Sequence, residues 1–182
     1  MFSHSPEVKK ADLLAQRLVG GATEATKIIL EDMGKHHASL REKASMPQFM
    51  TEIIVFYMHL VDRSAFAYLG VTKRDTFAER FEVMVLQETL SELNKDVSAD
   101  DFGKLLRDTY NRRQMQYANY KGLVPNGDEP PKDTLCWEFT KILFSFLNTI
   151  NPVTFAVFHG LVLRITKVML QDTLKVEEVL RG

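Results

Sequence analysis

Apolar and polar positions recur with a helical period along most of the chain. Near the N-terminus, the apolar residues keep one helical phase that runs through Gly20 and Gly21. This spacing is typical of an amphipathic α-helix with one buried face. The two glycines leave two alternatives: one long helix, kinked at the glycines, or separate helices over 6–19 and 22–43.

Residues that favour helix starts divide the rest of the chain. Ser, Thr, Asp and Asn side chains accept hydrogen bonds from free amides in the first turn, and proline fits the first helical position. No segment shows sustained two-residue alternation typical of a strand. The pattern predicts an all-α fold, a helical bundle or orthogonal array of about six helices. The expected starts are Ser5-Pro6, Ser45, Thr72, Ser98, Asp133 or Thr134, and Asn151-Pro152.

One long loop is expected over 122–133, where Pro-Asn-Gly and Pro-Pro forbid a continuous helix. A length of 182 residues fits one domain. We therefore expect a single all-α domain over 1–182, with a surface loop between its N-terminal and C-terminal helices. The alternative is that the loop separates two subdomains.

The segment 47–70 is apolar on nearly every side, which predicts a buried helix. It nevertheless contains Glu52, His59, Asp62 and Arg63. At 100° per residue, Glu52, His59 and Arg63 fall within about 40° of one another around the helix axis. Because burial of an unpaired charge is costly, each of these groups is expected to have a partner.

The next helix offers such partners. Gly70 is expected to end the buried helix, and the two helices then fold back as a hairpin. Counting residues away from the turn places Glu52 opposite Glu88, and other glutamates opposite His59 and Arg63. Ordinary ion pairs and core hydrogen bonds explain this arrangement. Two alternatives remain: a metal or proton-transfer site, or a pocket for an anion or small ligand that uses Arg63 and His59.

Composition narrows the function classes. The net charge is −1 and there is a single cysteine, Cys136, which has no flanking catalytic motif and is expected to be an inert core thiol. The N-terminus lacks a secretory signal, and the apolar run over 152–165 is shorter than the roughly 20 residues that span a bilayer. Glycine-rich nucleotide loops, zinc-protease spacing and the hydrolase Ser motif are absent. We expect a cytoplasmic protein with no cofactor and no membrane partner.

Aromatic and basic residues alternate over 107–121. Tyr110, Arg113, Tyr117 and Tyr120 follow helical spacing. They are candidates for a partner surface, although a helix packed on its own domain has the same pattern. Single-stranded nucleic acid is a further but disfavoured partner.

The C-terminal half is rich in phenylalanine and contains His159 as an internal polar group. Such residues line an apolar ligand cavity or a subunit interface, or they simply fill a core. The phenylalanines are Phe139, Phe144, Phe146, Phe155 and Phe158.

These patterns favour a non-catalytic interaction or small-ligand-binding protein, with a homodimer as one form of the interaction. The alternative is a metal-dependent or carboxylate-based enzyme centred on Glu52, His59 and Glu88. A nucleic-acid accessory factor is the weaker alternative. Ligand-binding candidates are Glu52, His59, Asp62, Arg63, Glu88 and His159.

Overall fold

Helices make up the ordered elements of the protein. The structure, a computed structural model, describes residues 5–34, 46–92, 98–120, 122–124, 132–147 and 151–182. Within these ranges there are six α-helices and no strand, which confirms the all-α prediction. The helices are α1 (Pro6–Gly34), α3 (Met46–Glu92), α4 (Ala99–Tyr117), α5 (Leu135–Phe144), α6 (Pro152–Val168) and α7 (Val176–Arg181). A 3₁₀ turn, η1 (Ser145–Leu147), follows α5, and a π-helical turn, η2 (Met169–Leu174), follows α6.

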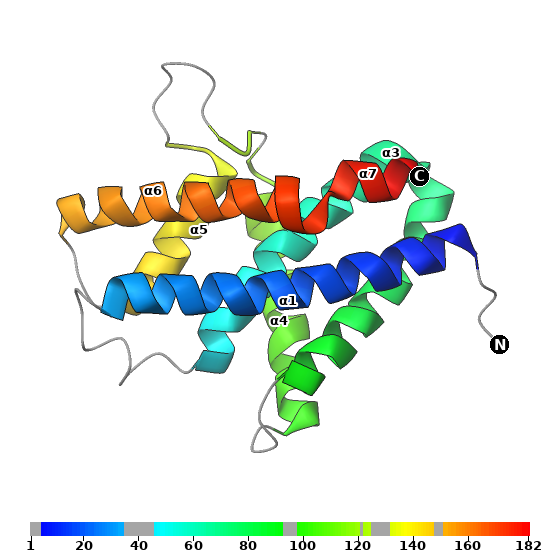
Figure 1. The fold of residues 1–182 in the computed structure, drawn as a ribbon, viewed down its shortest axis with the longest axis horizontal. Coiled ribbons are helices and arrows are strands. Elements are labelled where there is room, and N and C mark those ends of the chain that lie inside the picture. Colours follow the sequence, from blue (N-terminus) through cyan, green and yellow to red (C-terminus); the bar gives the residue numbers. More distant parts are fainter. Residues whose placement is uncertain (1–4, 35–45, 93–97, 121, 125–131, 148–150) are drawn as a thin grey trace.

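Two long helices, α1 and α6, run in opposite directions across the front of the molecule in Figure 1. Helix α3 packs along α1, α4 packs on α3, and α5 packs on α6. One cluster of buried apolar side chains draws on all of these helices. The core therefore lies between the α1–α6 pair and the helices behind it.

Helix α1 is continuous through Gly20 and Gly21, so the alternative with two separate helices is wrong for this segment. The second glycine lies where the π-helical turn approaches α1. A β-carbon at Gly21 would lie 2.6 Å from Sδ of Met169, whereas a β-carbon at Gly20 would have no neighbour within 4 Å. Gly21 thus permits close packing of η2 on α1.

Helix α3 bends sharply at Gly70, where φ is 70° and ψ is 175°. The chain folds back there, and a contact across the bend shows this: Arg74 donates to both carboxylate oxygens of Asp62, at 3.0 and 2.8 Å. Twelve residues of straight helix would separate these two side chains by about 18 Å. The predicted break at Gly70 and the fold-back of the two halves are confirmed.

From its start at Asn151-Pro152, the sequence predicts one last helix that continues to about Leu180, and this prediction is wrong because the helix is interrupted. The π-helical turn ends at Lys175, which has left-handed backbone angles (φ 48°, ψ 47°), and α7 then packs on α3. Helix α1 holds this bend, since Arg17 donates to the carbonyl of Leu174 and Lys10 donates to that of Leu180.

By length and composition alone, the 30 residues Pro152–Arg181 are apolar enough to cross a bilayer. In the structure, 39% of their most apolar stretch is buried inside the protein. A core helix of a soluble protein passes the same test, so this feature is weak evidence for a membrane span.

Four predicted helix caps are present among the described residues. The side chains of Ser5, Ser98, Thr134 and Asn151 each accept a hydrogen bond from a backbone amide of the following turn. The ends of the predicted loop are joined by a hydrogen bond of 2.9 Å from the Leu135 amide to the Gly122 carbonyl. The rest of that loop, at 125–131, and the predicted cap Ser45 lie outside the described residues.

Candidate functional site

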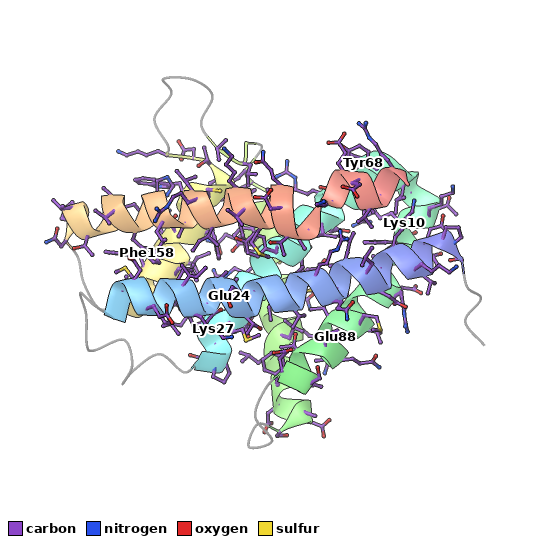
Figure 2. All side chains as sticks on the ribbon, viewed as in Figure 1. Lys10, Glu24, Lys27, Tyr68, Glu88 and Phe158 are labelled. Atoms are coloured by element: carbon purple, nitrogen blue, oxygen red, sulfur yellow. The ribbon has the colours of Figure 1, made fainter. Side chains whose placement is uncertain are left out.

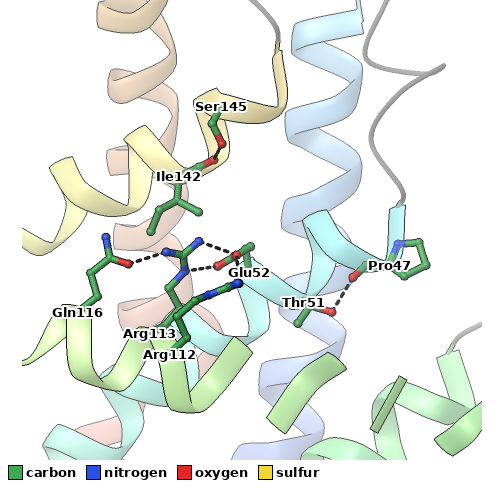
Figure 3. A network of polar contacts seen from close by, with 8 residues as sticks. All are labelled: Pro47, Thr51, Glu52, Arg112, Arg113, Gln116, Ile142 and Ser145. Atoms are coloured by element: carbon green, nitrogen blue, oxygen red, sulfur yellow. Dashed lines mark hydrogen bonds and ion pairs between the residues drawn. The ribbon is translucent and has the colours of Figure 1, made fainter. Parts of the chain in front are cut away.

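The polar stripe on the first half of α3 faces α4. Glu52 is almost fully buried, and both of its carboxylate oxygens accept hydrogen bonds from Arg113, at 2.8 and 2.7 Å. Arg112 adds a longer contact of 3.3 Å to the same carboxylate. Figure 3 shows both arginines beside Glu52, with Gln116 on the other side of Arg113. The carboxylate is thus held by two cations, as an ordinary buried ion pair.

The other ionisable groups of the stripe also have partners. Nδ1 of His59 hydrogen-bonds to Oε1 of Gln114. Arg63 donates to the backbone carbonyl of Tyr120 at 3.0 Å. Burial is the main reason that the pKa of His59 lies below its usual value, so the imidazole is neutral at neutral pH. The hydrogen bond predicted for His59 within the core is present, although its Nε2 is buried with no partner among the described residues.

The partners predicted by counting residues from the turn are wrong. Glu52 binds arginines of α4, and it is not paired with Glu88 in a shared carboxylate site. Glu88 is half-buried on the second half of α3, apart from α5 and α6 (Figure 2). Within the described part of the chain, no group of three or more His, Cys, Asp and Glu side chains is placed to hold a metal ion. Glu52, His59 and Glu88 therefore do not form the metal centre considered as an alternative.

The Tyr/Arg pattern of α4 faces the interior of the protein. Tyr117 is fully buried, and Tyr110, Arg113 and Tyr120 are partly buried. Tyr117 packs edge-on against Phe56 of α3 with ring centroids 5.8 Å apart. The interpretation of this pattern as a helix packed on its own domain fits these contacts, and its use as a partner surface does not.

The polar network continues from α4 to α5 through Glu138. This carboxylate accepts hydrogen bonds from Gln116 at 2.6 Å and from the Tyr120 hydroxyl at 2.9 Å, and it pairs with Lys141. Burial acts to raise the pKa of Glu138, but the hydrogen bonds from these partners outweigh it and lower the pKa. Since Gln116 also binds Arg113, the network extends from Glu52 to Lys141.

Lys141 lies at the edge of a pocket between α5 and α6. The pocket has a volume of about 550 Å³. Its walls are aromatic: the Trp137 ring meets Phe155 at a centroid distance of 4.8 Å and His159 at 5.1 Å, both edge to face. The lining residues are Trp137, Lys141, Phe144, Pro152, Phe155, Ala156 and His159.

His159 is the one predicted ligand candidate that the structure places in this pocket. Only 7% of the residue is exposed. Its Nδ1 lies 2.8 Å from the hydroxyl of Thr140, whereas its Nε2 is buried with no hydrogen-bond partner among the described residues. Nε2 of His59 and the hydroxyls of Thr23 and Tyr117 are buried without a described partner in the same way, so this nitrogen does not by itself indicate a ligand.

The phenylalanine-rich segment contributes to both the pocket and the core. Phe144 and Phe155 line the pocket, as expected for a ligand cavity. Phe139 stacks on Phe56 at 3.8 Å, and Phe158 points into the core (Figure 2). Cys136 is buried, and burial raises the pKa of its thiol to about 12, which confirms the inert core thiol.

Sequence reasoning missed Trp137, Thr140, Lys141 and Ala156. The available signal was the helical spacing of Trp137, Thr140 and Lys141, which are three and four residues apart and share one face of α5. That spacing does not reveal which helix the face contacts. The pairing with α6 is visible only in the fold.

Comparison with protein-family models, with curated proteins and with solved structures finds no match for this chain. The functional assignment therefore rests on the geometry of the site.

Proposed function

We propose that this protein is a non-catalytic small-ligand-binding protein whose binding site is the pocket between α5 and α6. One observation carries the proposal. The pocket is lined by the aromatic side chains Trp137, Phe144 and Phe155 together with His159, which is only 7% exposed. Such a combination of apolar walls and one oriented polar group is typical of small-molecule sites.

The size and walls of the pocket support this proposal. Its volume of about 550 Å³ falls within the range of roughly 300–1,000 Å³ that ligand pockets occupy. Trp137, Phe144 and Phe155 provide flat apolar surfaces on which a ring can stack or pack edge-on. These side chains would supply most of the binding free energy through burial of apolar area.

The polar network supports a fixed site. Lys141 at the pocket edge is tied to Glu138, and Glu138 is tied to α4 through Gln116 and Tyr120. A binding site held by packed helices and their hydrogen bonds loses little freedom when a ligand enters. At Glu52, by contrast, the carboxylate is already occupied by Arg113.

The single tryptophan of the chain, Trp137, makes the proposal directly testable. Its indole N–H gives one cross-peak in a ¹H–¹⁵N correlation spectrum, and its ring lines the pocket. We expect a neutral aromatic probe, 2-naphthol, to shift this cross-peak saturably in the wild-type protein. Native mass spectrometry of freshly purified protein would show in parallel whether a small molecule is retained.

A matched pair of variants tests whether the probe binds in the pocket between α5 and α6. Ala156→Phe places a large side chain in the pocket, whereas Val157→Phe places the same side chain on an exposed position of the same helix. We expect Ala156→Phe to abolish the saturable shift and Val157→Phe to preserve it, with thermal unfolding to verify that both variants fold. A shift that persists in Ala156→Phe, or its absence in the wild type, would overturn the proposal.

A further inference from the structure

A second pocket lies where both halves of α3 meet α4. It has a volume of about 150 Å³, below the roughly 300–1,000 Å³ of sites for drug-sized ligands, so its ligand must be small. Met58, Leu86 and Tyr110 contribute to its walls, and it shares no lining residue with the pocket between α5 and α6. Two side chains of opposite charge, Glu82 and Arg107, also line it.

The guanidinium of Arg107 reaches the wall of this pocket at Gly103. Nη1 of Arg107 lies 3.6 Å from the point that a β-carbon would occupy at Gly103, and both δ-carbons of Leu86 lie 3.7 Å from the same point. All three residues line the pocket, so a donor nitrogen and an apolar side chain meet at one place on its wall. Arg107 is exposed, and no hydrogen bond or ion pair joins it to another described side chain.

The carboxylate of Glu82 is accessible at the surface and also lacks a cation. Partial burial is the main cause that raises the pKa of Glu82, and the charge of Asp62 raises it further. Arg74 binds both oxygens of Asp62, whereas Glu82 has no hydrogen bond or ion pair among the described residues. Because a nearby cation would lower the pKa of a carboxyl group, Arg107 does not neutralise Glu82.

The two charges lie at different points along the pocket. The charge of Glu82 raises the pKa of Tyr110, which places the carboxylate on the side of the Tyr110 hydroxyl. Arg107 instead reaches back to Gly103, and α4 rises by about 10 Å between Gly103 and Tyr110. A ligand that pairs with both charges therefore needs an ammonium and a carboxylate at opposite ends of a chain.

We propose that the pocket between α3 and α4 binds a small linear amino acid, a zwitterion whose ammonium pairs with Glu82 and whose carboxylate pairs with Arg107. The planar donors of a guanidinium match the two oxygens of a carboxylate. The aliphatic chain of the ligand packs against Met58 and Leu86. A ligand with a single charge would leave one protein charge covered and unpaired, which is costly.

The test compares three probes with the same chain length. 5-Aminopentanoate carries both charges, pentanoate lacks the ammonium, and pentylamine lacks the carboxylate. From the worth of one hydrogen bond to a charged group, we expect the zwitterion to bind about tenfold more tightly than either of the others. The dissociation constants follow from the backbone amide cross-peak of Gly103 in ¹H–¹⁵N spectra, at neutral pH and low ionic strength.

Two variants assign this preference to the pair of charges. In Glu82→Gln, 5-aminopentanoate should bind no more tightly than pentanoate, and in Arg107→Gln no more tightly than pentylamine. Glu79→Gln and Lys104→Gln change exposed residues of the same two helices that do not line the pocket. These matched controls should keep the preference for the zwitterion, and thermal unfolding verifies that all four variants fold.

The outcomes are separable from those for the pocket between α5 and α6. Equal binding of 5-aminopentanoate and either singly charged probe, or a preference that survives Glu82→Gln or Arg107→Gln, would overturn the inference. The absence of any saturable shift at Gly103 would overturn it as well. None of these results affects the binding of 2-naphthol next to Trp137, so neither proposal depends on the other.

Discussion

Glu52 of α3 and Arg113 of α4 form a buried ion pair with two parallel hydrogen bonds. Nε and a terminal nitrogen of the guanidinium each lie within 2.8 Å of a separate carboxylate oxygen. The side chains are only 6% and 15% exposed. Their mutual neutralisation allows two charges to remain between packed helices, and the first prediction concerns this pair.

Removal of Arg113 should destabilise the protein strongly, because the buried Glu52 carboxylate then keeps only the longer contact of 3.3 Å to the exposed Arg112. We expect Arg113→Met to lower the free energy of unfolding by about 3–5 kcal/mol, measured by urea denaturation. Arg112→Met is the matched control: its side chain is 62% exposed, and we expect a loss of no more than about 1 kcal/mol. The double variant Glu52→Leu with Arg113→Met should lose less than Arg113→Met alone. Equal losses in the two arginine variants would contradict this account of the pair.

The adjacent glycines of α1 should respond oppositely to alanine. At Gly20 the new methyl group has no neighbour within 4 Å, so the gain in helix propensity should stabilise the protein by about 0.5–1 kcal/mol. At Gly21 the new methyl group would lie 2.6 Å from Sδ of Met169 and 2.9 Å from Cγ2 of Thr173. We therefore expect Gly21→Ala to be less stable than Gly20→Ala by about 1–3 kcal/mol in thermal unfolding. Equal stability of the two variants would show that η2 does not pack closely on α1.

The sharp bend of α3 should depend on the glycine at its corner. Gly70 combines a φ of 70° with a ψ of 175°, a region that side-chain-bearing residues avoid. Nothing crowds a β-carbon there, so the cost of Gly70→Ala is the backbone strain alone, about 1–3 kcal/mol. Gly160→Ala, at an exposed helical position with no neighbour within 4 Å, is the matched control and should not lose stability. Chemical denaturation of both variants would test this, and an unchanged Gly70→Ala would rule out strain at the bend.

Stability should fall as the pH drops below about 6.5, the usual pKa of histidine in an unfolded chain. Burial is the main cause that lowers the folded-state pKa of both His59 and His159. At His59, the charge of Arg63 lowers the pKa further, whereas the Gln114 hydrogen bond and the charge of Asp62 raise it. Between the folded and unfolded pKa values, the unfolded state binds more protons, so acid favours unfolding.

Urea midpoints measured from pH 7.5 to 5 check this prediction. The double variant His59→Gln with His159→Gln should show a weaker pH dependence over that interval. The histidines outside the described residues are the same in both proteins, so they cancel in the comparison. An equal pH dependence in the double variant would mean that these two imidazoles are not the cause.

The sequence predicted the local features of the fold well. Caps at Ser98, Thr134 and Asn151 depend on hydrogen bonds to residues two or three positions ahead, and the bend at Gly70 depends on the freedom of one glycine. The burial predicted for 47–70 is confirmed for most of 47–61 but is wrong for most of 62–70, where Phe66 is 59% exposed and Tyr68 40% exposed. Such features are determined within a few residues, so they can be read without knowledge of the fold.

The sequence did not predict which distant residues are in contact. Register counting paired the polar stripe of α3 with the second half of the same helix, but α4 occupies that face and supplies Arg113 and Gln114. The left-handed residue Lys175, which ends the π-helical turn, had no glycine or proline to mark it. In each case the contacts come from segments far apart in the chain, and local spacing contains no information about them.

The amino-acid sequence alone therefore determined an all-α chain with a mostly buried central helix, and it identified His159 as a polar group within an aromatic segment. Only the tertiary structure brought Thr140 of α5 against Nδ1 of that histidine and placed the residue at the wall of an aromatic pocket. The physical reason is that helix periodicity depends on neighbours three and four residues away, whereas a binding site depends on which helix faces pack together.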